Sequence, residues 1–118
     1  PVVMIESSRS AISDAQKTAQ NHGLALDIRQ ADANRFSVGD AFFDVAILDP
    51  PRAGSPGVIP QLLLTHPRAL IMVSCNYRAL ARDIRPARNA GYTITTLDIY
   101  EMFPQTPHVE VLCVLERP

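Results

Sequence analysis

Residues 70–76 read Leu-Ile-Met-Val-Ser-Cys-Asn, an apolar run that ends abruptly on Cys75 and is followed at once by a helical pattern. A run of this kind is typical of a buried strand in an α/β sheet. Ligands bind at the carboxyl ends of the strands in such sheets, and Cys75 stands at that end of its strand. The unpaired amides at the start of the following helix favour a thiolate, so Cys75 is the candidate for covalent chemistry.

Length and composition narrow the class of protein. The chain has 118 residues, of which 47% are hydrophobic, which suits one compact domain with a core and is too short for two. A net charge of -1 predicts no broad basic surface, so any nucleic-acid partner would be held locally or by parts outside this chain. Two cysteines without a signal-peptide pattern or a long apolar run predict a cytoplasmic protein that does not enter a membrane. No Cys/His spacing suggests a metal site.

Hydrophobic periodicity, turn residues and caps predict an alternation of strands and helices. We expect a first strand that is buried on both faces, a helix that Gly23 closes, a helix that opens at Ser55-Pro56, and a helix that Pro86 kinks. Strands are predicted at 1–6, 24–32, 44–48, 69–74, 92–100 and 109–116, and helices at 10–22, 55–63 and 77–90. This order predicts a mostly parallel α/β sheet that is finished by a C-terminal pair of strands.

Acidic residues follow the predicted strands at the same end as Cys75. Glu6, Asp32 and Asp49 each fall at or just after the end of a predicted parallel strand. If the last strand runs antiparallel to the others, Glu110 at its start lies at that same edge. The sequence therefore predicts that four carboxylates and one thiol converge at the edge where ligands bind.

Four motifs occur in order along the chain. They are Asp-Pro-Pro-Arg-Ala-Gly at 49–54, Val-Ser-Cys-Asn at 73–76 followed by Leu-Ala-Arg-Asp at 80–83, Met-Phe-Pro at 102–104, and His-Val-Glu at 108–110. Together they resemble the S-adenosylmethionine-dependent RNA 5-methyluridine (uracil-5-) methyltransferases. The resemblance implies a Rossmann-like class I methyltransferase sheet of strand order 3-2-1-4-5-7-6. Residues 1–118 would be part of that domain, from its second strand to its end, without the first strand and its glycine-rich loop.

The resemblance also implies a reaction and its residues. A methyl group would pass from S-adenosyl-L-methionine to C5 of a uridine in tRNA or rRNA, with Cys75 adding to C6 and Glu110 removing the C5 proton. The chemistry suits these residue types, because C5 of uracil is a weak nucleophile until a thiolate adds at C6. For the cofactor, the resemblance assigns Glu6 to the ribose hydroxyls, Asp32 to the region of the adenine, and Asp49 to the space between cofactor and uracil.

Two departures from the family pattern and several alternatives stay open. Tyr77 and Gln105 stand where proline and histidine are common in the family. An amino-group methyltransferase could use Asp-Pro-Pro at 49–51, although that motif usually ends in an aromatic residue and here Arg52 follows. RNA cytosine C5 enzymes typically carry a cysteine where this chain has Pro51. A third alternative is a non-catalytic fragment that self-associates, because a missing strand leaves sheet edges unpaired.

Structural roles compete with functional ones at several positions. Asp49 could simply cap a turn before two prolines. Cys113, without a motif around it, is expected in the core. Met102 and Phe103 are expected to pack under the loop at 101–108. Four arginines on the helix at 77–90 are expected to form a solvated face rather than a phosphate-binding stripe: Arg78, Arg82, Arg85 and Arg88.

Overall fold

The computed structural model describes residues 2–118, and the expectation that the first strand includes Pro1 lies outside them. The chain divides into two compact units, one ending at Phe36 and one beginning at Ser37. The elements are β1 (Val2–Glu6), α1 (Arg9–Asn21), β2 (Leu26–Gln30), η1 (Ala33–Arg35), β3 (Val45–Leu48), α2 (Val58–Leu62), η2 (Leu63–Thr65), β4 (Ala69–Ser74), α3 (Tyr77–Asp83), α4 (Arg85–Asn89), β5 (Thr93–Tyr100) and β6 (Glu110–Glu116). They follow the order of strands and helices that the sequence predicts.

The first unit is a strand-helix-strand motif. β1 and β2 pair in parallel, and α1 begins at the cap Ser8, whose hydroxyl accepts a 3.4 Å hydrogen bond from the Ala11 N–H. Gly23 follows the helix with a φ of 62°, a left-handed conformation that glycine adopts without strain, as predicted. The expectation that the first strand is buried on both faces was wrong for the described residues 2–6, because Val2 is exposed and the other four are half-buried.

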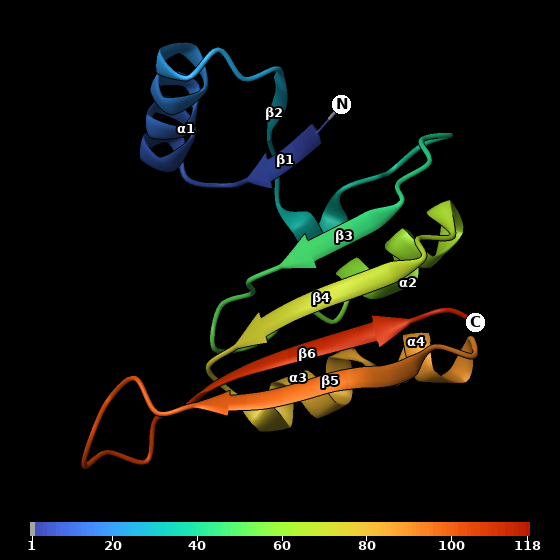
Figure 1. The fold of residues 1–118 in the computed structure, drawn as a ribbon. Helices are drawn as coiled ribbons and strands as arrows, with labels where there is room; N and C mark the ends of the chain where they lie inside the picture. Colours follow the sequence, from blue (N-terminus) through green and yellow to red (C-terminus); the bar gives the residue numbers. More distant parts are fainter. Residues whose placement is uncertain (1) are drawn as a thin grey trace. The chain divides into compact units, whose positions relative to one another are not determined.

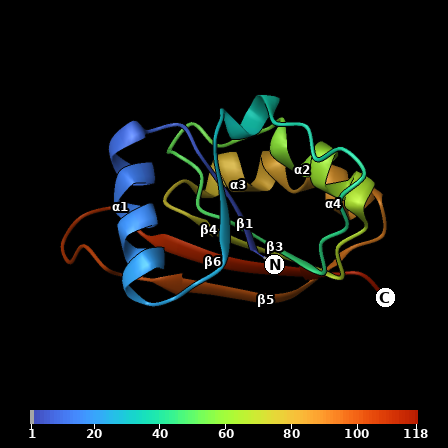
Figure 2. The same cartoon turned by 90° about the horizontal axis from the view of Figure 1, so that it is seen from above.

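The second unit is a four-stranded sheet of order β3-β4-β6-β5, in which β3 and β4 are parallel and β6 is antiparallel to both of its neighbours (Figure 1). Helices α2, α3 and α4 lie on one face of this sheet (Figure 2). The side chains between helices and sheet form the core, and the fully buried ones include Ile59, Leu70, Met72, Cys113 and Leu115. The predictions of an antiparallel last strand and of a core position for Cys113 are confirmed.

Two helices differ from their predicted limits. The helix predicted at 77–90 is divided into α3 and α4 at Ile84, because Pro86 has no N–H to continue the ladder and its ring excludes a straight path. The helix predicted to open at Ser55-Pro56 begins later, at Val58, with Gly57 as its cap. The Ser55 N–H donates instead to the side chain of Asp83 on α3.

The strand pairings agree with the sheet order that the family resemblance implies, with its first strand left out. β1 pairs with β2, and β3 pairs with β4, so each of β1 and β3 has one edge without a partner strand in the described residues. Ile47 on β3 is 75% exposed. Among residues 2–118, no helix has the length and apolar character needed to cross a membrane.

Candidate active site

The carboxyl ends of β3 and β4 and the start of β6 meet at one edge of the four-stranded sheet. Ser74, the last residue of β4, pairs with Val111, so Cys75 and Glu110 come next on their strands at this edge. Leu48 pairs with Met72, and Asp49 follows Leu48 directly. The antiparallel course of β6 therefore brings a carboxylate from the end of the chain to the residue that follows β4.

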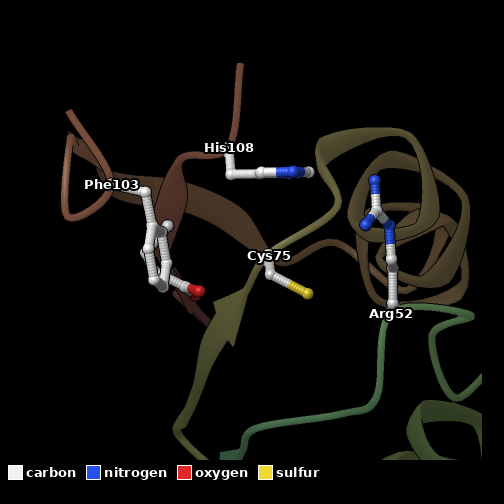
Figure 3. Close-up of a pocket in the computed structure, with 5 residues that line it drawn as sticks. Arg52, Cys75, Phe103 and His108 are labelled. Carbon is white, nitrogen blue, oxygen red and sulfur yellow. The ribbon is translucent and has the colours of Figure 1, made fainter. Parts of the chain in front are cut away.

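A pocket of about 240 Å³ opens at this edge and is lined by Arg52, Cys75, Phe103, His108 and Glu110. Figure 3 shows Phe103 and Arg52 on opposite sides of Cys75, with the thiol pointing toward the Arg52 side. The pocket thus combines a thiol, a carboxylate, a fixed positive charge and an aromatic ring. Asp49 lies at the same edge of the sheet but is not one of the lining residues.

The two cysteines have opposite environments. Cys75 is exposed at the pocket, whereas Cys113 has no exposed surface. Burial raises the pKa of the Cys113 thiol above its ordinary value, because the thiolate would lose its hydration. Only Cys75 is accessible to a substrate.

Asn76 determines the local structure around Cys75. Its side-chain oxygen accepts hydrogen bonds from the N–H groups of Arg78 (3.1 Å) and Ala79 (3.3 Å), which caps α3. Its side-chain nitrogen donates to the carbonyl oxygen of Arg52 at 2.9 Å. The expectation of free amides beside the thiol was wrong for these two N–H groups, because Asn76 already binds them.

The loop between β5 and β6 brings two lining residues to the pocket. The carbonyl of Phe103 accepts from the N–H (3.2 Å) and the hydroxyl (2.7 Å) of Thr106, and that hydroxyl oxygen accepts from the His108 N–H at 3.3 Å. Met102 and Phe103 are 65% and 52% exposed, so the expectation that they pack under the loop was wrong. The loop projects beyond the ends of β5 and β6 (Figure 1).

Sequence reasoning did not select Arg52 or Phe103 as site residues. Arg52 follows directly on the Asp-Pro-Pro turn at a strand end, and that position was the available signal. Phe103 could not have been placed, because its distance from Cys75 depends on how β5 and β6 pair. His108, which begins the His-Val-Glu motif at 108–110, also lines the pocket.

The remaining acidic candidates lie in the first unit, at the carboxyl edge of β1 and β2. One oxygen of the half-buried Glu6 carboxylate, Oε1, accepts a 2.7 Å hydrogen bond from the Ser8 N–H. Its other oxygen accepts no hydrogen bond among the described residues, so it could accept from a ligand hydroxyl. Asp32 instead caps η1 by accepting from the Asn34 N–H at 2.9 Å. Residues 2–118 contain no cluster of three or more metal-ligating side chains.

The fold is that of the class I S-adenosylmethionine-dependent methyltransferases. A tRNA (uracil-54, C5)-methyltransferase from Pyrococcus abyssi, solved in complex with S-adenosyl-L-homocysteine, superposes with a TM-score of 0.81 at 33% identity over 97% of this chain and 28% of its own. TrmN from Thermus thermophilus shares the fold at 19% identity, with a TM-score of 0.69, over 100% of this chain and 36% of its own.

Sequence comparison identifies the family. Residues 8–118 match the model of the tRNA (Uracil-5-)-methyltransferases, and the chain belongs to this family. The 23S rRNA (uracil(1939)-C(5))-methyltransferase RlmD from Klebsiella pneumoniae is 36% identical over 98% of this chain and 28% of its own length. RlmD from Bordetella parapertussis is also 36% identical, over 97% of this chain and 27% of its own. The chain therefore spans about a quarter of the length of these relatives.

Proposed function

We propose that this chain is part of the catalytic domain of an enzyme that transfers a methyl group from S-adenosyl-L-methionine to C5 of a uridine in tRNA or rRNA, in the cytoplasm. The observation that carries this proposal is the position of Cys75 and Glu110 in one pocket at the carboxyl edge of the sheet. The family of the chain and the reactions named for its relatives support it.

In the proposed mechanism, Cys75 is the nucleophile. Its thiolate adds to C6 of the uracil ring, the C5–C6 π electrons move onto C5 and the C4 carbonyl, and C5 becomes a nucleophilic enolate carbon. C5 would then take up the electrophilic methyl group that bound S-adenosyl-L-methionine would supply, with cleavage of its S–CH3 bond and release of S-adenosyl-L-homocysteine. The carboxylate of Glu110 then removes the proton from C5, the C5–C6 double bond forms again, and the Cys75 sulfur leaves as a thiolate.

The residues for the cofactor are Glu6, Asp32 and Asp49. The free carboxylate oxygen of Glu6 fits an acceptor for ribose hydroxyls, which is how a strand-end carboxylate recognises a ribose in related folds. Asp32 is assigned to the neighbourhood of the adenine, and Asp49 to the space between cofactor and uracil. The target base must leave its stack to reach Cys75, and the exposed ring of Phe103 offers a surface for it on one side of the pocket.

A mechanism-based trap tests the nucleophile. A version of the chain that is extended upstream by the first strand and glycine-rich loop that the family resemblance implies is incubated with S-adenosyl-L-methionine and RNA that carries 5-fluorouridine. The fluorine at C5 cannot leave as a proton would, so the adduct is expected to persist on Cys75 and to be located by peptide mass spectrometry. Cys113→Ala serves as the matched control and should still be trapped, because that thiol is buried. An adduct that survives in Cys75→Ala would overturn the assignment.

We also propose that residues 1–118 alone bind cofactor weakly, are inactive, and self-associate. The unpaired edges of β1 and β3 support this, because an exposed strand edge with apolar side chains tends to find another strand. Calorimetric titration with S-adenosyl-L-methionine should give clear binding for the version extended upstream and weak or no binding for residues 1–118. Equal affinity for the two would contradict the proposal.

A further inference from the structure

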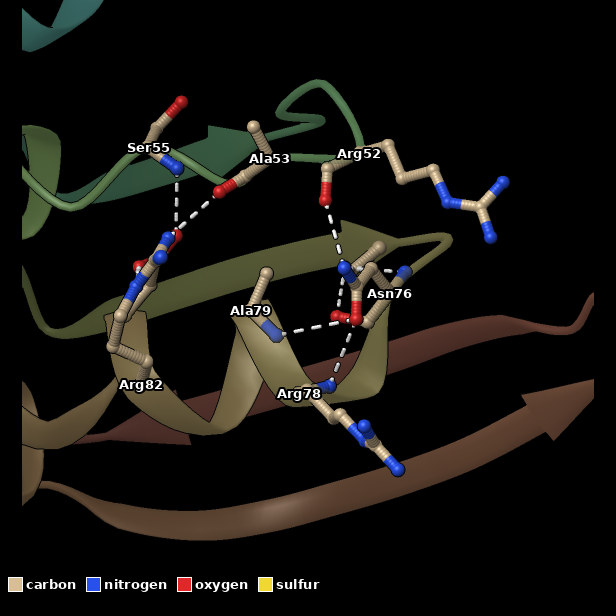
Figure 4. A network of polar contacts seen from close by, with 9 residues as sticks. Arg52, Ala53, Ser55, Asn76, Arg78, Ala79 and Arg82 are labelled. Carbon is tan, nitrogen blue, oxygen red and sulfur yellow. Dashed lines mark hydrogen bonds and ion pairs between the residues drawn. The ribbon is translucent and has the colours of Figure 1, made fainter.

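The loop between β3 and α2 carries Arg52. Three side chains at or just before α3 bind this loop: Asn76, Arg82 and Asp83 (Figure 4). Asn76 donates to the carbonyl of Arg52 at 2.9 Å, and the Arg82 guanidinium donates to the carbonyl of Ala53 at 2.8 Å. The Asp83 carboxylate accepts from the Ser55 N–H at 2.6 Å. Successive backbone groups of the loop are thus held by the helix that begins just after Cys75.

Asp83 is a buried charge for which the proposed chemistry has no direct use. Its side chain is 1% exposed, and it pairs with the half-exposed Arg82 guanidinium at 2.7 Å, while its second oxygen binds the Ser55 N–H. A buried carboxylate is tolerated only when its partners stay in place. The bonds of Asp83 therefore fix the loop and Arg82 in one arrangement.

Gly54 shows how closely the loop approaches this pair. It has a φ of +80°, and a Cβ atom placed on it would collide with the Asp83 carboxylate and the Arg82 guanidinium. The loop can reach the two side chains only because this position has no side chain of its own.

We propose that Arg82 and Asp83 are positioning residues that hold the Arg52 guanidinium at the pocket beside the Cys75 thiol. The loop and the thiol are joined through the same short helix, so their relative position is set by bonds within the protein before any substrate arrives. The inference deepens the proposed function, since it concerns the charge beside the nucleophile, but its test requires neither methyl transfer nor RNA.

The test compares two alkylating reagents on the 118-residue chain. Iodoacetate is an anion and iodoacetamide is neutral, so the ratio of their rates at Cys75, located by peptide mass spectrometry, reports positive charge near the thiol. Arg52→Gln should lower this ratio by on the order of threefold to tenfold, as expected for the loss of one nearby charge. An unchanged ratio in this variant would show that Arg52 is not held beside Cys75 and would overturn the proposal.

Asp83→Asn is the decisive variant, because a purely electrostatic effect and a positioning role change the rate ratio in opposite directions. Removing a negative charge by itself should raise the ratio, whereas release of the loop and of Arg52 should lower it toward the Arg52→Gln value. Arg82→Lys keeps the positive charge but loses the guanidinium that binds both the Ala53 carbonyl and the Asp83 carboxylate. This variant should therefore lower the ratio as well. Arg85→Gln, which removes an exposed charge on α4, is the control and should leave the ratio near the wild-type value.

Thermal unfolding of each variant distinguishes a protein that does not fold from a folded protein in which the loop and Arg52 are displaced. If Asp83→Asn does not fold, Arg82→Lys decides, because Arg82 is half-exposed and its replacement leaves the core intact. A wild-type or higher ratio in folded Asp83→Asn, or a wild-type ratio in Arg82→Lys, would overturn the proposal. A failed 5-fluorouridine trap would refute the proposed reaction without changing any of these ratios.

Discussion

The carboxylate of Asp83 on α3 accepts a 2.6 Å hydrogen bond from the backbone N–H of Ser55, 28 residues earlier in the chain. This bond joins the turn after β3, which carries Arg52, to α3, which begins two residues after Cys75. It also leaves no space for a side chain at Gly54.

Gly54→Ala should therefore be strongly destabilising. The left-handed backbone and the collision with Asp83 and Arg82 add up to an expected loss of more than about 2 kcal/mol in the free energy of unfolding, measured by urea denaturation. Gly91→Ala is the matched control, because Gly91 has a φ of +92° and open space around it, and it should lose only about 1 kcal/mol. Equal losses in the two variants would show that the approach of Asp83 does not matter.

Glu110→Gln should stop the proposed reaction after methyl transfer. The amide cannot take the C5 proton, so the covalent adduct between Cys75 and ordinary uridine-containing RNA is expected to accumulate in the protein extended upstream. Denaturing electrophoresis would detect the adduct, and the added Cys75→Ala substitution should abolish it. Normal turnover by Glu110→Gln would assign the base to another group.

The stability of the second unit should fall in alkali because of Cys113. Burial raises the pKa of this thiol above its ordinary value of 9.0, so the folded state holds the proton more tightly than the unfolded state. The contribution of the Cys113 thiol to the free energy of unfolding is complete below pH 9.0. It is lost as the pH rises through the folded-state pKa, at up to about 1.4 kcal/mol per pH unit.

Urea denaturation at a series of pH values measures this slope, and Cys113→Ala should flatten it. Tyr92 adds a further loss at higher pH in both proteins, because burial also raises the pKa of its hydroxyl. A slope that Cys113→Ala leaves unchanged would assign the alkaline loss to other groups.

Ile47→Lys should reduce self-association of residues 1–118. Ile47 is 75% exposed on β3, whose outer edge has no partner strand in the described residues, and a lysine there opposes pairing with another strand. Sedimentation velocity over a range of concentrations should show a larger monomer fraction. Leu64→Lys, at a residue that is 71% exposed in η2, is the control and should not change the distribution. The same shift in both variants would point to general solubility instead of an edge contact.

Local patterns in the sequence were sufficient to predict most of the secondary structure. The run at 69–74 matches β4 at both ends, because a continuous apolar run and a flanking proline define a strand without reference to distant residues. Pro86 likewise predicted the interruption between α3 and α4, since its effect is confined to one turn. The motifs around Asp49, Cys75 and Glu110 were enough to indicate the family.

Tertiary structure decided which of these residues share a pocket. Cys75 and Glu110 meet because β6 pairs antiparallel with β4, and Phe103 joins them because the loop after β5 returns to the same edge. The contact between Asp83 and Ser55 could not be predicted either, because a hydrogen bond over 28 residues depends on how α3 packs beside the turn after β3. The sequence by itself determined the elements and the reactive groups, since these follow from short-range sterics and side-chain chemistry. Their arrangement around Cys75 was decided by strand pairing and burial, which act between residues that are far apart in the chain.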